Sequence, residues 1–177
     1  MIRDDELNRL VKYAQGLGVK VVFSTAQSKA AADWTLDGSE ITVYKKSNTN
    51  KTDLLLNMIH ELGHQAWFIH ERNRKPDLKF EEAIGRQDEF DLGKKNNPAP
   101  KNLREKILNV ERASTEYWYG IYKETNMKFP LYKLYIQMEI DVWQYEVLHE
   151  TGQFPTLREV RAKLKEITPK YKAKSYE

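Results

Sequence analysis

The segment from Thr52 to His70 constrains the fold most, because it places two histidines four positions apart inside an apolar run. Its centre, His60 to His64, reads H-E-L-G-H. Residues four apart lie on the same face of a helix, so both imidazoles can reach one metal ion. In this H-E-x-x-H pattern the histidines bind zinc and the glutamate acts as general base. We therefore predict a helix that is capped by Thr52, runs to about Glu71 and carries a zinc site.

The surroundings of the motif are apolar, whereas a chance copy on a solvated helix would have polar neighbours. The apolar positions are Leu54, Leu55, Leu56, Met58, Ile59, Leu62, Ala66 and Ile69. Gly63 lowers helix stability, and a glycine at this position makes sense where another backbone passes close to it. The alternative interpretation is a pair of ordinary core or surface histidines that bind no metal.

Composition limits the ligands and the partners. The chain has 177 residues and no cysteine, so a metal must be held by histidine, aspartate or glutamate. With 31% charged and 40% hydrophobic residues, it has the balance of one soluble domain. We see no membrane-spanning run and no signal peptide, and we expect a cytoplasmic protein without a membrane partner. The net charge of +3 is a mild excess, so nucleic acid is not the expected main partner.

The order of the predicted elements indicates an α+β fold. A helix over 4–15 and a β-rich run over 19–23 precede a hairpin with an Asp37-Gly38 turn. We therefore predict a small antiparallel sheet of about three strands, followed by a mostly helical domain. The later helices are expected over 102–123 and 131–150, and from a capping box at Thr156 onward, with a frayed tail after Pro169.

Residues 72–101 differ in character from the rest of the chain. They are charged, contain Pro76, Pro98 and Pro100, and hold few apolar residues. We predict a polar surface insertion with one short helix around 80–84. The alternatives are a disordered loop and a lid over the site.

A catalytic zinc site needs a third protein ligand, and Glu111 is the first candidate. On a helix it shares a stripe with Leu103, Ile107, Ser114 and Trp118. A carboxylate in an apolar stripe is expensive to bury, so a metal or another cation is expected beside it. The alternative partner is an ordinary salt bridge to a lysine or arginine.

Three other residues are open as the third ligand. Glu139 also sits in an apolar stripe and could instead orient a ligand histidine, and Glu116 lies on a more polar face. His60, His64 and His70 have the spacing of the longer H-E-x-x-H-x-x-G-x-x-H motif, but Trp67 stands in place of its glycine. If the helix continues, His70 lies about 120° around the axis from His64 and points elsewhere.

The H-E-L-G-H segment and the later Glu111-Arg112-Ala113-Ser114-Thr115 together resemble the gluzincin metallopeptidases. The compact form is most similar to small ImmA/IrrE-type and phage-encoded H-E-x-x-H proteins. In those families a glutamate on a later helix binds zinc, and the resemblance maps that role onto Glu111. Thr115 stands where these families have aspartate or asparagine. The resemblance covers residues 34–120. We predict a zincin-like domain over 1–150, with the insertion 72–101 inside it, and a C-terminal helix and tail over 151–177.

The activity implied is zinc-dependent hydrolysis of a peptide bond by a metal-activated water, with Glu61 as general base. The ligands would be His60, His64 and Glu111, and the partner a protein or peptide substrate, held by strand addition along the sheet edge. The oxyanion donor is open among Arg112, Tyr117, Tyr119 and Tyr122. The alternative function is a non-catalytic regulatory module that binds a protein or nucleic-acid-associated partner through its C-terminal helices.

Overall fold

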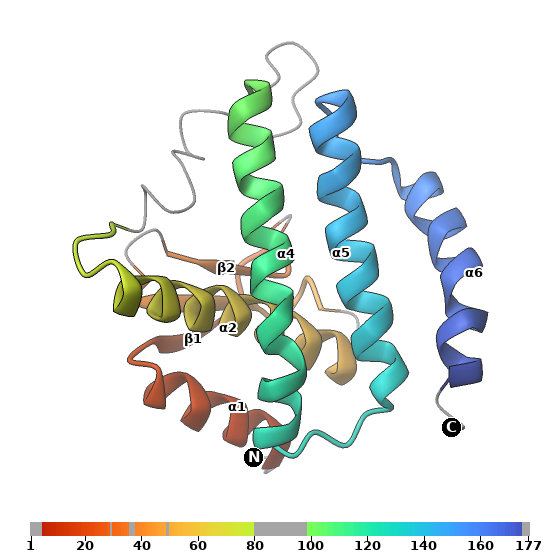
Figure 1. Cartoon of the computed structure of the whole chain (residues 1–177). Coiled ribbons are helices and arrows are strands. Elements are labelled where there is room, and N and C mark those ends of the chain that lie inside the picture. Colours follow the sequence, from red (N-terminus) through yellow and green to blue (C-terminus); the bar gives the residue numbers. More distant parts are fainter. Residues whose placement is uncertain (1–4, 29, 36–37, 49, 80–98, 175–177) are drawn as a thin grey trace. The chain divides into compact units, whose positions relative to one another are not determined.

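The computed structural model describes residues 5–28, 30–35, 38–48, 50–79 and 99–174 (Figure 1). The chain forms two compact units. Unit 1 contains Met1–Glu81 and Ser114–Phe129, and unit 2 contains Glu82–Ala113 and Pro130–Glu177. A small sheet followed by long helices makes this an α+β fold, as predicted.

The sheet of unit 1 has three strands in the order β1-β3-β2, where β1 is Lys20–Ser24, β2 is Ala32–Trp34 and β3 is Glu40–Tyr44. β2 pairs antiparallel with β3, but β1 pairs parallel with β3, so the prediction of a purely antiparallel sheet is wrong. The reason is the strand order. In a simple meander β2 would lie between β1 and β3, and each neighbouring pair would be antiparallel. Here β3 occupies the centre instead, so it lies beside β1, which runs in the same direction.

The turn that joins β2 to β3 is held by its backbone. Thr35 and Glu40 close the loop with an N–H···O bond of 2.9 Å, and the Gly38 N–H donates to the Thr35 carbonyl at 2.8 Å. Gly38 has a φ of 69°, a left-handed conformation that glycine adopts without steric cost. Asp37, the other residue of the predicted turn, lies outside the described residues.

Helices α1 (Asp5–Gly16) and α2 (Lys51–Arg74) pack with the sheet. α2 begins one residue before Thr52, because the Asn50 side chain caps it and accepts from the Asp53 N–H at 3.1 Å. The predicted cap was therefore wrong, whereas the predicted helix is present. The core of unit 1 includes the fully buried side chains of Leu10, Ile41, Leu55, Met58, Ile59, Leu62 and Trp118.

Helix α4 (Lys101–Glu124) is continuous and runs from unit 2 into unit 1. Its C-terminal turns and the residues that follow them belong to unit 1 and bond to α1. The Arg9 side chain on α1 donates to the Asn126 carbonyl at 2.8 Å, and the Lys128 N–H donates to Glu6 at 2.6 Å. These bonds join parts of the chain that are more than a hundred positions apart.

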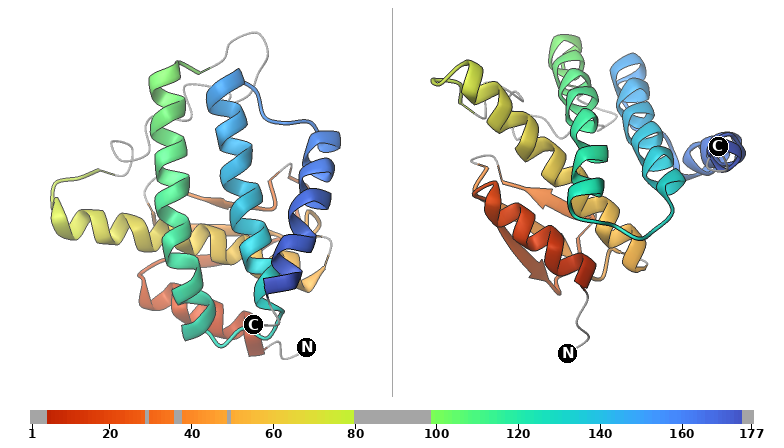
Figure 2. Two further views of the ribbon diagram at one scale, coloured as in Figure 1. Left: turned by 45° about the vertical axis from the view of Figure 1, so that its right-hand side comes forward. Right: turned by 60° about the horizontal axis from the view of Figure 1, so that its bottom comes forward.

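Unit 2 contains the first half of α4, then α5 (Leu131–Thr151) and α6 (Leu157–Lys174), which lie side by side (Figure 2). Gly152 ends α5 with a φ of 78°. The predicted capping box opens α6, where the Glu159 N–H donates to the Thr156 hydroxyl at 3.3 Å and the Thr156 N–H donates to the Glu159 carboxylate at 2.7 Å.

The predicted fraying after Pro169 is wrong, because α6 continues through this proline to Lys174. Contacts beyond the proline hold the last turns, since Tyr171 and Lys170 both bind Glu139 of α5. Most of the predicted insertion, residues 80–98, including its short helix, lies outside the described residues.

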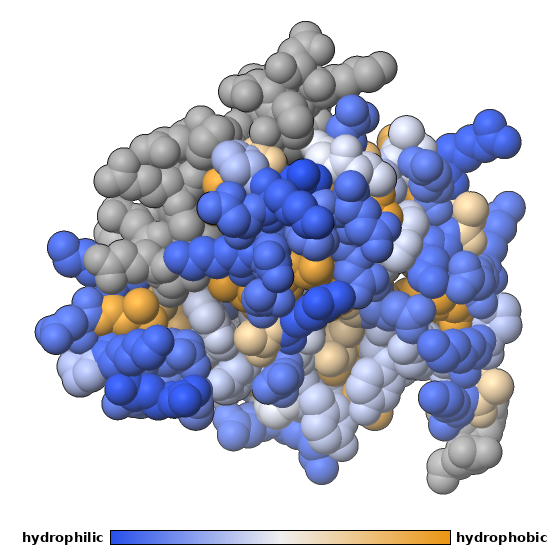
Figure 3. All heavy atoms as spheres, turned by 45° about the horizontal axis from the view of Figure 1, so that its top comes forward, coloured by the Kyte–Doolittle hydropathy of each residue, from blue (hydrophilic) through white to orange (hydrophobic). Residues whose placement is uncertain are grey.

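Hydrophilic side chains dominate the coloured surface of the face in Figure 3, and hydrophobic ones form small patches between them. Among the helices described, none combines the length and apolar character that a membrane crossing requires.

Candidate metal centre

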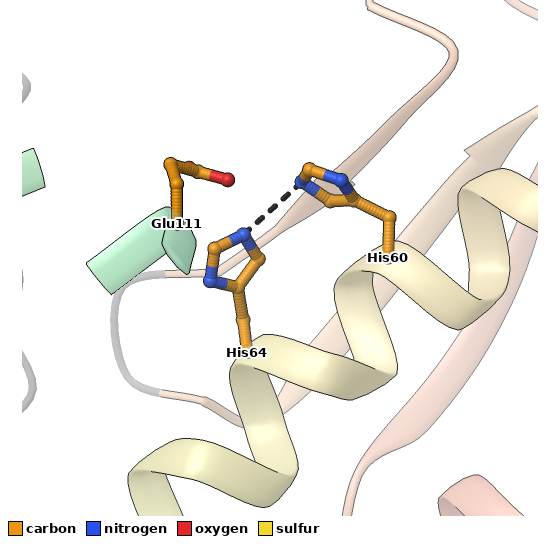
Figure 4. Close-up of side chains that lie close together, drawn as sticks. All are labelled: His60, His64 and Glu111. Carbon is orange, nitrogen blue, oxygen red and sulfur yellow. Dashed lines mark hydrogen bonds between the residues drawn. The ribbon is translucent and has the colours of Figure 1, made fainter. Parts of the chain in front are cut away.

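His60 and His64 project from consecutive turns of α2, and the Nε2 atom of each ring points toward the Nε2 atom of the other. Their Nε2 atoms are 3.1 Å apart (Figure 4). His64 is 6% exposed and His60 is half-buried. Two ligand atoms on a tetrahedral zinc ion lie about 3.3 Å apart, given Zn–N distances of about 2.05 Å. The two imidazoles therefore already have the separation that a shared metal ion requires.

The Glu111 carboxylate faces this pair (Figure 4). One donor atom from each of His60, His64 and Glu111 lies within 4.8 Å of the others, and across the described residues no second such group of three occurs. Glu111 is only 5% exposed. It belongs to the same continuous helix as Ser114 and Trp118, which pack against α2 inside unit 1, so α4 itself carries the carboxylate to the histidines.

Gly63 allows α4 to approach α2 this closely. A Cβ atom built at Gly63 would lie 2.9 Å from the Ser114 carbonyl oxygen and would overlap the Trp118 indole. Both contacts are closer than a Cβ atom tolerates, so only glycine fits at this position without a shift of its neighbours. The predicted close approach of another backbone at Gly63 is thus confirmed, and that backbone lies one turn from Glu111.

Two tryptophans border the histidines, and the sequence pattern did not identify either as part of the site. Trp34 of β2 stacks on His64, with ring centroids 5.5 Å apart and 18° between the planes. Trp118 of α4 meets His60 edge-on, with centroids 5.2 Å apart. A tryptophan in a strand or on an apolar helix stripe indicates burial. Its partner depends on tertiary packing, so no signal in the sequence could have found these contacts.

Two of the alternative ligands do not join this group. His70 is exposed at the far end of α2, where its ring lies 6.2 Å from that of Tyr117. The helix continues past it, as the geometric argument against His70 required. Glu116 is also exposed.

Glu139 of α5 has a different set of partners, all of them on α6. It accepts hydrogen bonds from Tyr171 and from Lys170 and forms a longer ion pair with Lys163 at 3.7 Å. Partial burial acts to raise the pKa of Glu139, but these hydrogen bonds and lysine charges outweigh it and hold the pKa below its usual value. Burial and then Glu139 raise the pKa of Tyr171 to about 12.

The suggested oxyanion donors are engaged in other contacts. Arg112 pairs with Glu146 at 2.6 Å, and the Tyr122 hydroxyl donates to the Phe129 carbonyl at 2.7 Å. Tyr119 is 41% exposed and lies beneath Lys123. Burial, followed by the charges of nearby glutamates, raises the pKa of Tyr117, which lies beside His70.

The donor chemistry of the three converging residues suits zinc, which binds imidazole nitrogen and carboxylate oxygen in four-coordinate sites. Two histidines and one glutamate could supply three ligands to such an ion and would leave one position open, an arrangement typical of catalytic rather than structural zinc. Comparison of the chain with models of known protein families, with curated proteins and with solved structures finds no match.

Proposed function

We propose that this protein is a zinc-dependent metallopeptidase. The observation that carries the proposal is the convergence of the His60 and His64 Nε2 atoms, 3.1 Å apart, on the buried carboxylate of Glu111. A chance pair of core histidines would not be expected to face a buried carboxylate from a helix more than forty positions further along the chain. The resemblance of the motif to gluzincins supports the same conclusion.

In the proposed reaction His60, His64 and Glu111 hold the metal. When bound, zinc would act as a Lewis acid toward the scissile carbonyl and make water acidic enough to lose a proton near neutral pH. Glu61, which neighbours His60 on α2 and is half-buried, would accept this proton and later deliver it to the departing amine nitrogen.

The sheet offers a way to hold an extended peptide. β2 lies at one edge of the sheet, and its last residue, Trp34, stacks on His64. A peptide added alongside β2 would therefore run past the histidines. Main-chain hydrogen bonds would then supply binding without a deep pocket, and the expected substrate is an unfolded or extended segment of a protein.

The test begins with the metal content of the purified protein, followed by cleavage of an unfolded protein mixture with and without added zinc. Glu61→Gln keeps the size of the side chain and removes the base, so it should retain zinc while cleavage falls by at least about a hundredfold. Glu105→Gln, an exposed change on α4, is the matched control. A wild-type protein that binds no zinc, or a Glu61→Gln variant that cleaves at the wild-type rate, would contradict the proposal.

A second candidate function rests on the charge of α6. Arg158, Arg161 and Lys165 are exposed at positions that follow one helix face, whereas Glu159 and Glu166 lie on another. Such a stripe favours binding of nucleic acid through its phosphates. This candidate predicts salt-dependent binding of an oligonucleotide. Glu61→Gln should leave this binding unchanged, and a variant that combines Arg158→Gln, Arg161→Gln and Lys165→Gln should lose it.

A further inference from the structure

The indole of Trp34 covers one face of the His64 imidazole. The two rings are stacked, with centroids 5.5 Å apart and planes inclined by 18°. Phe68, one turn after His64 on α2, meets the same indole edge-on at 6.4 Å. His64 and Phe68 are both almost fully buried. Trp34 therefore packs against two successive turns of the helix that carries the proposed ligands.

A chain of two hydrogen bonds that begins at the indole nitrogen fixes this position. Trp34 Nε1 donates to the Gln65 side-chain oxygen at 2.9 Å, and Gln65 Nε2 donates to the Leu17 carbonyl at 3.3 Å. Gln65 is 5% exposed, so replacing one member of this chain would leave buried polar atoms unsatisfied, at a cost in stability. The chain of bonds thus links the segment after α1, helix α2 and strand β2 at one point.

The plane of a metal-binding imidazole decides whether it can bind. The lone pair of Nε2 lies in the ring plane, so a metal ion must lie there as well. Rotation about the Cβ–Cγ bond would move His64 Nε2 away from His60 and Glu111. Torsions of this kind have broad energy minima, so the histidine side chain alone fixes its plane poorly. A parallel aromatic ring on one face restricts this rotation.

We propose that Trp34 is a positioning residue that holds the His64 ring in the metal-binding plane and thereby strengthens metal binding. The proposal rests on the proposed function, since His64 must be a ligand for its plane to matter. Groups that orient metal ligands commonly change affinity by a factor of ten or more. Here the orienting group is an aromatic stack, anchored by Gln65, and it lies on the strand that would also hold the substrate.

The experiment measures zinc and cobalt affinity by competition with a chelator, together with the visible absorption of bound cobalt. Trp34→Leu removes the stack and the hydrogen bond, and should weaken binding about tenfold and change the cobalt spectrum. Trp34→Phe keeps a ring over His64 and should recover part of the affinity. Gln65→Met removes the anchor of the indole and should give an intermediate loss.

Trp67→Leu is the matched control, because Trp67 is also a half-buried tryptophan, on α2. Among the described residues it makes no ring contact with His60 or His64. If Trp34 contributes only to stability, both leucine variants should lower the melting temperature without changing the cobalt spectrum. Wild-type affinity and an unchanged spectrum in Trp34→Leu would overturn the proposal.

A measurement without metal separates this proposal from the proposed function. In the NMR spectrum of the metal-free protein, the indole should shift the His64 ring protons upfield through its ring current. Trp34→Leu should abolish this shift, and the ring should then sample several orientations. If the wild type binds no metal, the peptidase proposal fails. If His64 keeps a single ring orientation in Trp34→Leu, the positioning role fails, whatever the metal result.

Discussion

Glu111 and Glu139 are both glutamates in apolar stripes of long helices, but the structure gives them different environments. Glu111 is 5% exposed and faces two imidazoles. The Glu139 side chain is 24% exposed and is matched by two lysines and a tyrosine of α6. The apolar stripe thus identifies a carboxylate that needs a partner, but the partner itself comes from whichever element packs against the helix. The difference separates a candidate metal ligand from a structural ion pair.

The largest expected effect on zinc affinity comes from removing the carboxylate of Glu111. Glu111→Gln keeps the shape of the side chain and removes its charge, so zinc affinity should fall by at least about a hundredfold. Glu139→Gln is the matched control and should bind zinc as the wild type does. Zinc content after dialysis, measured by mass spectrometry, checks both variants. If Glu139→Gln is the variant that loses zinc, the distinction between the two glutamates collapses.

The next prediction concerns the close packing of α4 against α2 at Gly63, which brings Glu111 near the histidines. Gly63→Ala should destabilise the protein by about 2 kcal/mol, because the new methyl group overlaps Trp118 and the Ser114 carbonyl. Urea unfolding gives this value, and zinc affinity should fall with it as α4 shifts. Gly120→Ala on α4 is the control. A Cβ atom there meets nothing within 4 Å, so alanine should stabilise the helix by about 0.5–1 kcal/mol. Equal effects at the two glycines would refute the close-packing argument.

The environment of Glu139 predicts a smaller effect that depends on pH. Tyr171→Phe should cost about 1 kcal/mol at neutral pH, because it removes one hydrogen bond to a carboxylate. The pKa of Tyr171 is raised from 10.0 to about 12, so the folded state favours its protonated form. This contribution is complete below pH 10 and is lost as the pH rises toward 12.

Urea unfolding at several pH values checks this prediction. Wild type should lose more stability than Tyr171→Phe between pH 10 and pH 12, the range set by the two pKa values. The pKa of Glu139 is lowered, so its own contribution is present above its ordinary value and declines as the pH falls through the folded-state value. Parallel curves for the two proteins at high pH would show that Tyr171 does not interact with Glu139 in this way.

The smallest expected effect belongs to His70. It is exposed and lies outside the converging group, so His70→Ala should leave zinc content and affinity unchanged. His60→Ala, the corresponding change inside the group, should remove zinc. A loss of zinc in His70→Ala would revive the longer histidine motif and would remove Glu111 from the proposed ligand set.

The sequence was sufficient to predict the features that depend on local spacing. The motif helix and the capping box at Thr156 follow from residues within a few positions of one another. The burial of Glu111 was predicted in the same way, from its stripe of apolar neighbours. Its selection over Glu139 as the first candidate stays a prediction about metal binding until zinc retention is measured.

Features that depend on distant partners could not be predicted. The parallel pairing of β1 with β3 follows from the strand order, which no local pattern encodes. The stack of Trp34 on His64 joins an edge strand to a helix. The persistence of α6 beyond Pro169 depends on Tyr171 reaching Glu139, which outweighs the local tendency of proline to end a helix.

Unit 1 is assembled from two separate stretches of chain, Met1–Glu81 and Ser114–Phe129, and this has a consequence for biosynthesis. A nascent chain that has left the ribosome only through Glu81 contains the whole sheet and both motif histidines, His60 and His64. It lacks the Asn126 carbonyl that binds Arg9 and the Trp118 ring that fills the notch at Gly63. The core between α1, α2 and the sheet is therefore complete only after α4 has been synthesised. A gene fragment that ends before Ser114 should yield an aggregation-prone product.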